Sequence, residues 1–451
     1  MTLRVHPDEV VAERPMGVLG IHDSWERVRL GAIADVLNGF PFPSASFGST
    51  GTMPLIRIRD VGRPDTDTWY SGSFDPQYIV EPGSVIVGMD GDFRAGKWQG
   101  PPALLNQRVC KVTVRSSDLY SPDFLRHALP GYLDAINRHT SAVTVKHLSS
   151  ETVKDLPLPL PPRAEQDRIV AGIEEQFSRL DSGMAGLERV RERLRLLRDE
   201  GLLALISGTG VLQRLGDVAE IRLGRQRSPK NHAGPRLRPY LRAANVTWSG
   251  LDLRDVKLMN FSSQESSIYE LHRGDVLVAE ASGSASEVGK PAIWDESIAN
   301  CCFQNTLLRV RSDRFLPEYL YFVLLAHARG GTFARASRGV GIHHLSKSGL
   351  STLAVTVPEL AQQEAIVRWA RWLQASIARL LDDVEKQSAR VRTLRSAILG
   401  AAFSGELIHQ DPNDEPAASL LKRIAEARVT SNGHKTTKVR RSQTIVGRVP
   451  A

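Results

Sequence analysis

The stretch HLSSETVKDLPLPLPPRAEQDRIV, residues 147–170, decides the fold, because the chain contains a second version of it, HLSKSGLSTLAVTVPELAQQEAIV, residues 344–367. The copies keep one offset of 197 residues, from His147 to His344, and the same offset relates Ser207-Gly208 to Ser404-Gly405. A constant offset leaves no room for insertions or deletions between the copies over this region. Such a repeat predicts one structural unit that is used twice.

Upstream of these stretches the repeat continues, but its offset changes. Leu30-Gly31 matches Leu215-Gly216 at an offset of 185, and Gly96-Lys97 matches Gly289-Lys290 at an offset of 193. Loops of different length on a shared scaffold produce such a drift. We therefore expect six segments: an N-terminal extension (1–23), a first variable domain (24–160), a first long helix (161–208), a second variable domain (209–357), a second long helix (358–408), and a basic, partly disordered tail (409–451).

Each constant-length part is predicted to be one helix of about forty residues, or roughly 60 Å. Prolines suit the first turn of a helix, and both copies begin on them, at Pro161-Pro162 and Pro358. Apolar residues then recur in alternating steps of three and four, which is a heptad pattern. The expected seam is Ile169, Ile173, Leu180, Leu187, Leu194 and Leu197 in the first helix, and Ile366, Leu373, Ile377, Leu380, Val384, Val391, Leu394 and Ile398 in the second.

Helices of this length cannot bury their apolar stripes against their own small domains, so the two are expected to pack on each other. A twofold relation between the repeats would make them antiparallel. An ordinary helical hairpin or an oligomerisation arm is the alternative. The variable parts look like mixed α/β, with short β-branched strands such as 53–61 and a helix over 122–137. The predicted fold class is thus α+β: two mixed α/β domains separated by two long antiparallel helices that form a coiled coil, with a pseudo-twofold internal repeat.

Composition points to a nucleic-acid partner. The net charge is +8 and the sequence pI about 9.5, and Lys and Arg displace counterions from phosphates. The three cysteines, Cys110, Cys301 and Cys302, are too few and too badly spaced for a disulfide scaffold, which favours a reducing cytoplasm. No apolar stretch is long enough to span a membrane, and residues 1–21 are too charged for a signal peptide.

No motif with catalytic chemistry is complete. Gly91-Asp92-Phe93-Arg94-Ala95-Gly96-Lys97 begins like a phosphate-binding loop, but Trp98 replaces the required Ser or Thr and prolines follow. This loop is either a structural turn or a device that brings a lysine and backbone N–H groups to a phosphate. His343-His344 has no companion ligands at metal-binding spacing. We therefore expect no catalytic residue, no cofactor site and no metal site in this chain.

The chain resembles the specificity subunits of type I restriction-modification systems over residues 24–408. The similarity is carried by Leu158–Pro162 with Ala164-Glu165-Gln166, by Ala402–Leu407, by Leu55–Val61, and above all by the two-copy layout. The resemblance implies two target-recognition domains that each read half of a split DNA sequence. It implies that the helices act as a ruler and as the docking site for two methyltransferase subunits, which a restriction subunit can join. S-adenosylmethionine, and ATP with magnesium for restriction, would then belong to those partners.

Base reading in DNA grooves uses Arg, Lys, Asn and Gln, and each domain has candidates. In the first they are Arg57, Arg59, Arg94, Lys97, Gln107, Arg108 and Lys146; in the second, Arg242, Asn245, Lys290, Gln304, Asn305, Arg335, Arg338 and Lys347. Charged side chains are mostly exposed whatever their role, so a plain surface position is the alternative for each. The alternative for the whole chain is a DNA-binding scaffold, or a homodimer joined through its helices, without a modification partner.

Overall fold

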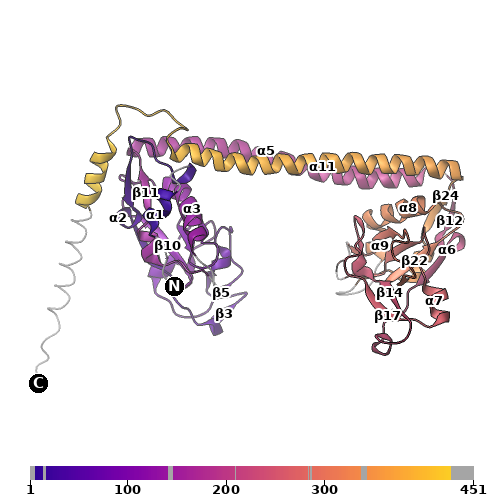
Figure 1. The fold of residues 1–451 in the computed structure, drawn as a ribbon. Helices are drawn as coiled ribbons and strands as arrows, with labels where there is room; N and C mark the ends of the chain where they lie inside the picture. Colours follow the sequence, from indigo (N-terminus) through magenta and orange to yellow (C-terminus); the bar gives the residue numbers. More distant parts are fainter. Residues whose placement is uncertain are drawn as a thin grey trace, which may run out of the picture. The chain divides into compact units, whose positions relative to one another are not determined.

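The computed structural model describes residues 6–13, 17–140, 146–208, 210–282, 284, 287–336 and 343–427 (Figure 1). The chain divides into two compact units. Unit 1 comprises residues 1–184 and 388–451, and unit 2 comprises residues 185–387. Each unit therefore contains one globular domain and a part of each of two long helices.

Unit 1 is built on three sheets. A two-stranded sheet pairs β1 (Glu26–Arg29) with β11 (Pro157–Leu160). A four-stranded antiparallel sheet has the order β2 (Ala34–Asn38), β10 (Val109–Val114), β7 (Val85–Gly88) and β8 (Ala95–Lys97). A five-stranded sheet has the order β3 (Phe47–Gly48), β5 (Trp69–Tyr70), β4 (Met53–Ile56), β9 (Ala103–Leu105) and β6 (Ile79–Val80), in which β4 and β9 run parallel.

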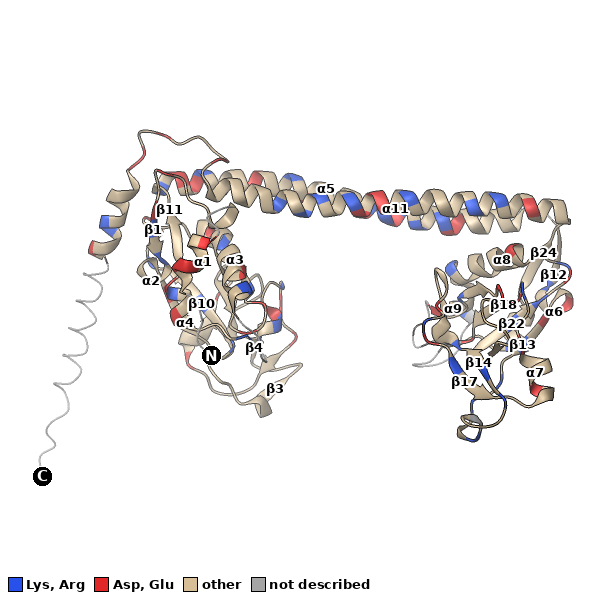
Figure 2. Cartoon of the chain, viewed as in Figure 1, with Lys and Arg blue, Asp and Glu red and all other residues tan. Residues whose placement is uncertain are grey.

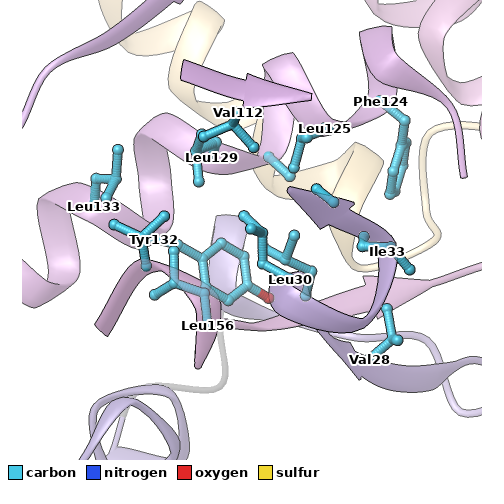
Figure 3. Packing of buried hydrophobic residues seen from close by; sticks show 14 of the residues in the cluster. Val28, Leu30, Ile33, Val112, Phe124, Leu125, Leu129, Tyr132, Leu133 and Leu156 are labelled. Carbon is cyan, nitrogen blue, oxygen red and sulfur yellow. The ribbon is translucent and has the colours of Figure 1, made fainter. Parts of the chain in front are cut away.

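The main core of unit 1 lies between the long helix α3 (Pro122–His139) and the strands (Figure 3). Its buried residues come from widely separated parts of the chain, including Val28, Leu30, Val112, Phe124, Leu125, Leu129 and Leu156. Short helices complete the unit: α1 (Pro7–Glu13), η1 (Gly17–Leu19), α2 (Leu30–Ile33), η2 (Ser44–Ser46), η3 (Ile58–Asp60), η4 (Pro76–Tyr78) and α4 (Ser150–Lys154).

Both ends of the chain contribute to this core. Val10 and Val11 of α1 are buried in it, although the sequence placed them in an extension. A helix over residues 417–427 buries Leu420 and Ile424 in the same cluster. Arg168 binds the carboxylate of Asp414 with two nitrogens, at 3.2 and 2.6 Å. The described segment after the second long helix, up to residue 427, thus packs on unit 1.

Unit 2 repeats the two-stranded and four-stranded sheets of unit 1 and part of its third sheet. Strand β12 (Val211–Arg214) pairs with β24 (Ala354–Val357), and a four-stranded sheet has the order β13 (Glu220–Leu223), β22 (Leu307–Arg311), β18 (Val276–Ala279) and β20 (Pro291–Ile293). A third sheet has the order β17 (Lys257–Asn260), β14 (Leu237–Leu241) and β21 (Cys302–Phe303), and β14 and β21 run parallel as β4 and β9 do. Two small pairs are β15 (Val246–Thr247) with β16 (Gly250–Leu251), and β19 (Ala281–Ser282) with β23 (His343–His344).

The helices of unit 2 also match those of unit 1. Helix α8 (Pro317–Arg329) takes the place of α3 and buries Tyr319, Leu320, Val323 and Leu324. The shorter helices are α6 (Leu215–Val218), η5 (Pro229–Asn231), η6 (Ala243–Asn245), α7 (Ser263–Tyr269), α9 (Thr332–Ala336) and α10 (Lys347–Ser351).

The two long helices are α5 (Arg163–Ser207) and α11 (Leu360–Phe403), and they run antiparallel. In unit 2, Arg191 pairs with Glu385, and a Cβ on Gly201 would lie 2.9 Å from Leu373. In unit 1, Arg395 donates to Asp181 at 2.7 Å and lies over the ring of Phe177. The contacting positions thus have decreasing residue numbers along α11 as the residue numbers along α5 increase, which is the order expected for antiparallel helices. Figure 2 shows charges of both signs along both helices.

The buried stripe follows an eleven-residue repeat in place of the expected heptad. On α5 it passes through Ile169, Leu180, Arg191 and Leu202, and on α11 through Ile366, Ile377, Ser388 and Leu399, all buried or half-buried. Eleven residues in three turns are close to the 3.6 residues per turn of a straight helix, whereas a strict heptad drifts by about 20° per repeat.

This drift corrects three of the predicted seam residues. Leu197, Leu380 and Leu394 are 54%, 48% and 51% exposed, and their neighbours Arg198, Leu381 and Arg395 take the half-buried positions. Of the remaining seam residues, Ile169, Ile173, Ile377 and Val384 are buried, and Leu180, Leu187, Leu194, Ile366, Leu373, Val391 and Ile398 are half-buried.

The predicted fold class is confirmed: two mixed α/β domains, an antiparallel helix pair and an internal repeat. Among the described residues, no helix is both long and apolar enough to cross a membrane.

Candidate nucleic-acid interface

A hollow of about 340 Å³ lies on unit 1 at the turn between β7 and β8. Arg59 and Arg94, both predicted to read DNA, line it together with Asp90 and Asp92. Both guanidinium groups lie at the surface, with side chains 46% and 69% exposed. The structure therefore brings together two candidates that are 35 residues apart in the sequence.

Carboxylates orient these arginines without burying them. Arg59 donates to Asp67 at 2.6 Å and to the hydroxyl of Thr68 at 2.9 Å. The hydrogen bond and positive charge of Arg59 lower the pKa of the Asp67 carboxyl below its ordinary value. Arg94 lies 3.2 Å from Asp92. Exposed ion pairs of this kind add little stability, so these guanidinium groups can exchange a carboxylate for an anionic ligand.

Asp90 joins three loops at the edge of the hollow. Its carboxylate, 15% exposed, lies 3.3 Å from Arg108 and 2.7 Å from Nδ1 of His147. Arg108, a third predicted candidate, is 63% exposed. Asn137 of α3 links the β7–β8 turn to the segment before His147, because its side chain donates to the carbonyl of Gly91 and accepts from Lys146.

The other predicted residues of unit 1 are placed less favourably. Lys146 donates from Nζ to two oxygens of Asn137, at 2.6 and 2.9 Å, so it braces the loop. Arg57 lies over the ring of Phe47. Gln107 is exposed beside Arg108. Lys97 is exposed but pairs with Val85, at the end of the β7–β8 hairpin away from the turn.

In unit 2 the prediction for Asn245 is wrong. Asn245 is 2% exposed, accepts from the backbone N–H of Arg242 at 3.1 Å, and donates to the carbonyls of Asp252 and Asp255. A side chain with its amide satisfied inside a turn cannot reach a base edge. Asp60 of unit 1, 185 residues earlier, is 0% exposed and accepts from the N–H of Arg57 at 2.8 Å in the same way.

The remaining candidates of unit 2 differ in accessibility. The side chain of Lys290 is only 15% exposed and pairs with Glu287 at 2.6 Å; hydrogen bonds from Lys290 and Trp248 lower the pKa of Glu287. Gln304 and Asn305 are half-buried in the turn between β21 and β22. Arg242 is 28% exposed and pairs with Asp255. Arg335 and Lys347 are exposed, and Arg338 lies outside the described residues.

Several residues that shape these loops were not predicted from the sequence. A Cβ on Gly39 would lie 2.1 Å from the carbonyl oxygen of Asn106, and one on Gly224 would lie 2.2 Å from that of Gln304. Gly39 and Gly224 share the offset of 185 with Leu30 and Leu215, so the repeat itself could have identified them. His147 and Asp90 were also missed as a pair, because the contact joins residues 57 positions apart.

The loop Gly91–Lys97 forms a tight hairpin turn. Gly91 and Phe93 have positive φ values of 72° and 50°, and the N–H of Gly91 donates to the carbonyl of Lys146 at 3.0 Å. Burial raises the pKa of all three cysteine thiols to about 12, which makes them unreactive. Within the described residues, no group of three or more His, Cys, Asp or Glu side chains could hold a metal ion.

Comparison with known proteins gives consistent matches. The family model described as "Type I restriction modification DNA specificity domain" matches twice, at residues 22–184 and 211–396. The chain is 33% identical to the Type I restriction enzyme EcoBI specificity subunit of Escherichia coli, over 95% of this chain and 98% of that protein. It is 25% identical to the EcoKI specificity subunit of Escherichia coli strain K12, over 86% and 91% of the two chains.

A solved structure shares the fold at 20% identity. It comes from work on complex assembly and conformational transition of the type I R-M system, covers 86% of this chain and 99% of its own, and aligns with a TM-score of 0.61. The two matched segments of the family model span well over half of the sequence, one in each repeat. The chain therefore belongs to the type I restriction modification DNA specificity family.

Proposed function

We propose that this chain is the DNA specificity subunit of a type I restriction-modification complex. The observation that supports this most strongly is the double match of the DNA specificity domain, which coincides with the two structural repeats. Two independent readers in one chain predict a bipartite target, with unread bases between the two half-sites.

In unit 1 we assign DNA contact to the surface around the hollow. Arg59 and Arg94 line the hollow, and the exposed Arg108 lies 3.3 Å from Asp90 at its edge. Arginine binds guanine edges with two parallel hydrogen bonds and also binds phosphates, so such a group can both position and read a duplex. In unit 2, the exposed Arg335 and Lys347 are the remaining candidates with free access.

The long helices offer a docking surface for methyltransferase subunits. Trp369 and Trp372 on α11 are 59% and 58% exposed, and their rings stack edge-on with centroids 5.6 Å apart. Leu380, eleven residues after Trp369, lies on the same side of the helix and is also exposed. Two exposed tryptophans form a large apolar surface, and Trp is enriched at the energetic centres of interfaces.

The chemistry in this proposal belongs to the partners. Two methyltransferase subunits would bind S-adenosylmethionine and transfer the methyl group, and a restriction subunit would use ATP and magnesium. In this proposal the chain itself contributes recognition and assembly.

Co-expression tests the proposal. The chain is expressed with its methyltransferase subunit in a host without other methylation, and methylated sites are mapped by sequencing. We expect one bipartite motif that disappears when the chain is omitted. Trp369→Ala with Trp372→Ala should abolish both the motif and co-purification of the methyltransferase, whereas the control Arg179→Ala, at an exposed position on α5, should keep both. A chain that purifies as a lone homodimer and supports no methylation would contradict the proposal.

A further inference from the structure

His147 and His344 occupy the same place in the two repeats and make the same kind of contact. Nδ1 of His147 lies 2.7 Å from a carboxylate oxygen of Asp90, and Nδ1 of His344 lies 3.3 Å from one of Glu280. The next residue fixes the backbone in each case: Leu148 N–H donates to Met89 and Leu345 N–H donates to Glu280, both at 2.7 Å.

The carboxylates that hold the two rings come from positions that do not correspond. The backbone bonds match Met89 with Glu280, so Asp90 lies one residue beyond the position equivalent to Glu280. Each repeat thus has a carboxylate that holds the histidine through Nδ1, but the two carboxylates belong to positions that do not correspond. What the repeats share is the orientation of the ring.

In both pairs the carboxylate lies inside and the ring faces outward. The side chains of Asp90 and Glu280 are 15% and 18% exposed, whereas those of His147 and His344 are 60% and 52% exposed. The described part of the chain offers neither Nε2 atom a hydrogen-bond partner. An exposed histidine–carboxylate pair contributes little to stability, so stability does not account for its presence in both repeats.

The arrangement suits an anion. When a carboxylate accepts from Nδ1–H, it fixes the orientation of the ring, as the partners of metal-bound and catalytic histidines do. This leaves Nε2 for a ligand: with the carboxylate at Nδ1 and a phosphate at Nε2, the ring can carry a proton on each nitrogen and donate a charge-assisted hydrogen bond to each anion. His147 contacts Asp90, which lines the hollow together with Arg59 and Arg94.

We propose that His147 and His344 each donate a hydrogen bond from Nε2 to a phosphate of the DNA backbone, and that Asp90 and Glu280 are positioning residues for these rings. The proposal rests on the proposed function and assigns a specific role: backbone contact, which positions the duplex without reading its sequence.

The test uses the full chain in complex with its methyltransferase and two duplexes of equal length, one with the mapped motif and one scrambled. His147→Gln and His344→Gln should each weaken binding by about threefold to tenfold. Because a phosphate contact does not depend on the base sequence, the affinity for both duplexes should fall by the same factor. The slope of log affinity against log salt should fall by about 1 for each variant. His409→Gln, at an exposed position of unit 1 without an assigned role, is the control.

The positioning role is tested in unit 2, where Glu280 holds His344 and no arginine of the described residues pairs with its carboxylate. Glu280→Gln should weaken binding as much as His344→Gln, and the double variant should be no weaker than either. Wild-type affinity and salt slope in the histidine variants, or a changed methylation motif, would overturn the inference. Failure of the wild-type complex to bind DNA would overturn the proposed function as well.

Discussion

Gln166 and Gln363, 197 residues apart, make the same two hydrogen bonds in the two units. Gln166 donates to the carbonyl of Pro161 at 3.0 Å and accepts from the N–H of Ser121 at 2.7 Å. Gln363 donates to the carbonyl of Pro358 at 3.0 Å and accepts from the N–H of Leu316 at 2.8 Å. Both side chains are 0% exposed. Each glutamine therefore ties the start of its long helix to the start of the domain helix, α3 or α8.

Gln166→Leu should destabilise unit 1 by about 1–3 kcal/mol, because the buried N–H of Ser121 and the carbonyl of Pro161 would lose their partner. Calorimetric unfolding measures the loss, and Gln363→Leu should lower the stability of unit 2 similarly. Gln387→Ala, at an exposed position of α11, should stay within about 0.5 kcal/mol of the wild type. Equal stability of Gln166→Leu and the wild type would contradict the assigned role.

Gly183→Ala should stabilise the protein by about 0.5–1 kcal/mol, since glycine inside a helix is unfavourable and an added Cβ would meet no atom within 4 Å. Gly39→Ala should do the reverse, because its Cβ would lie 2.1 Å from the backbone oxygen of Asn106. Urea titration of the two variants measures whether each substitution raises or lowers the free energy of unfolding. A destabilised Gly183→Ala variant would show that the first long helix is not continuous there.

His127 should make unit 1 less stable in mild acid. It is 7% exposed, and burial, with smaller contributions from the charges of Arg126 and Arg395, lowers its pKa to about 4. The unfolded chain takes up a proton near the ordinary histidine value of about 6.5, so stability is full above that pH and falls as the pH drops toward 4. The expected loss is roughly 2–3 kcal/mol.

His127→Phe keeps a ring against Phe177, which packs edge-on at 5.9 Å, and removes the titration. The difference in unfolding free energy between wild type and this variant should therefore change between about pH 6.5 and 4. His409→Gln should follow the wild-type curve. Parallel curves for wild type and His127→Phe would show that His127 does not titrate in this range.

Asn245→Ala should destabilise unit 2 by about 1–3 kcal/mol, through loss of its hydrogen bonds to the Arg242, Asp252 and Asp255 backbone. The methylated motif should stay the same, since Asn245 is buried away from any duplex. Methylome mapping and thermal unfolding of the same variant separate the two effects. A new base preference in the second half-site would show that Asn245 contacts a base after all.

The sequence predicted the large-scale architecture well because the repeat carries it. The offset of 197 located both helix starts and their prolines, and strongly periodic apolar residues predicted two long helices. The exact seam was harder, because heptad and eleven-residue patterns coincide over two turns and separate only further along, as at Leu197 and Leu394. Propensity could not resolve this difference.

The candidate site was less accessible to sequence reasoning. Residue type alone could not distinguish Arg94, which lines the hollow, from Asn245, which is buried in a turn, because their exposure depends on tertiary contacts. The carboxylate–histidine pairs Asp90–His147 and Glu280–His344 join positions 57 and 64 residues apart. Only the shared His-Leu-Ser triplet of the repeat pointed toward them.

The most direct test of the account is an exchange of residues 24–155 for the corresponding region of a family member with a different target, followed by methylome sequencing of cells that carry the methyltransferase. Two separate readers predict a motif in which one half-site changes while the other half and the unread gap stay as they were. A change in both half-sites, or loss of the second half-site alone, would contradict the assignment of one reader to each repeat.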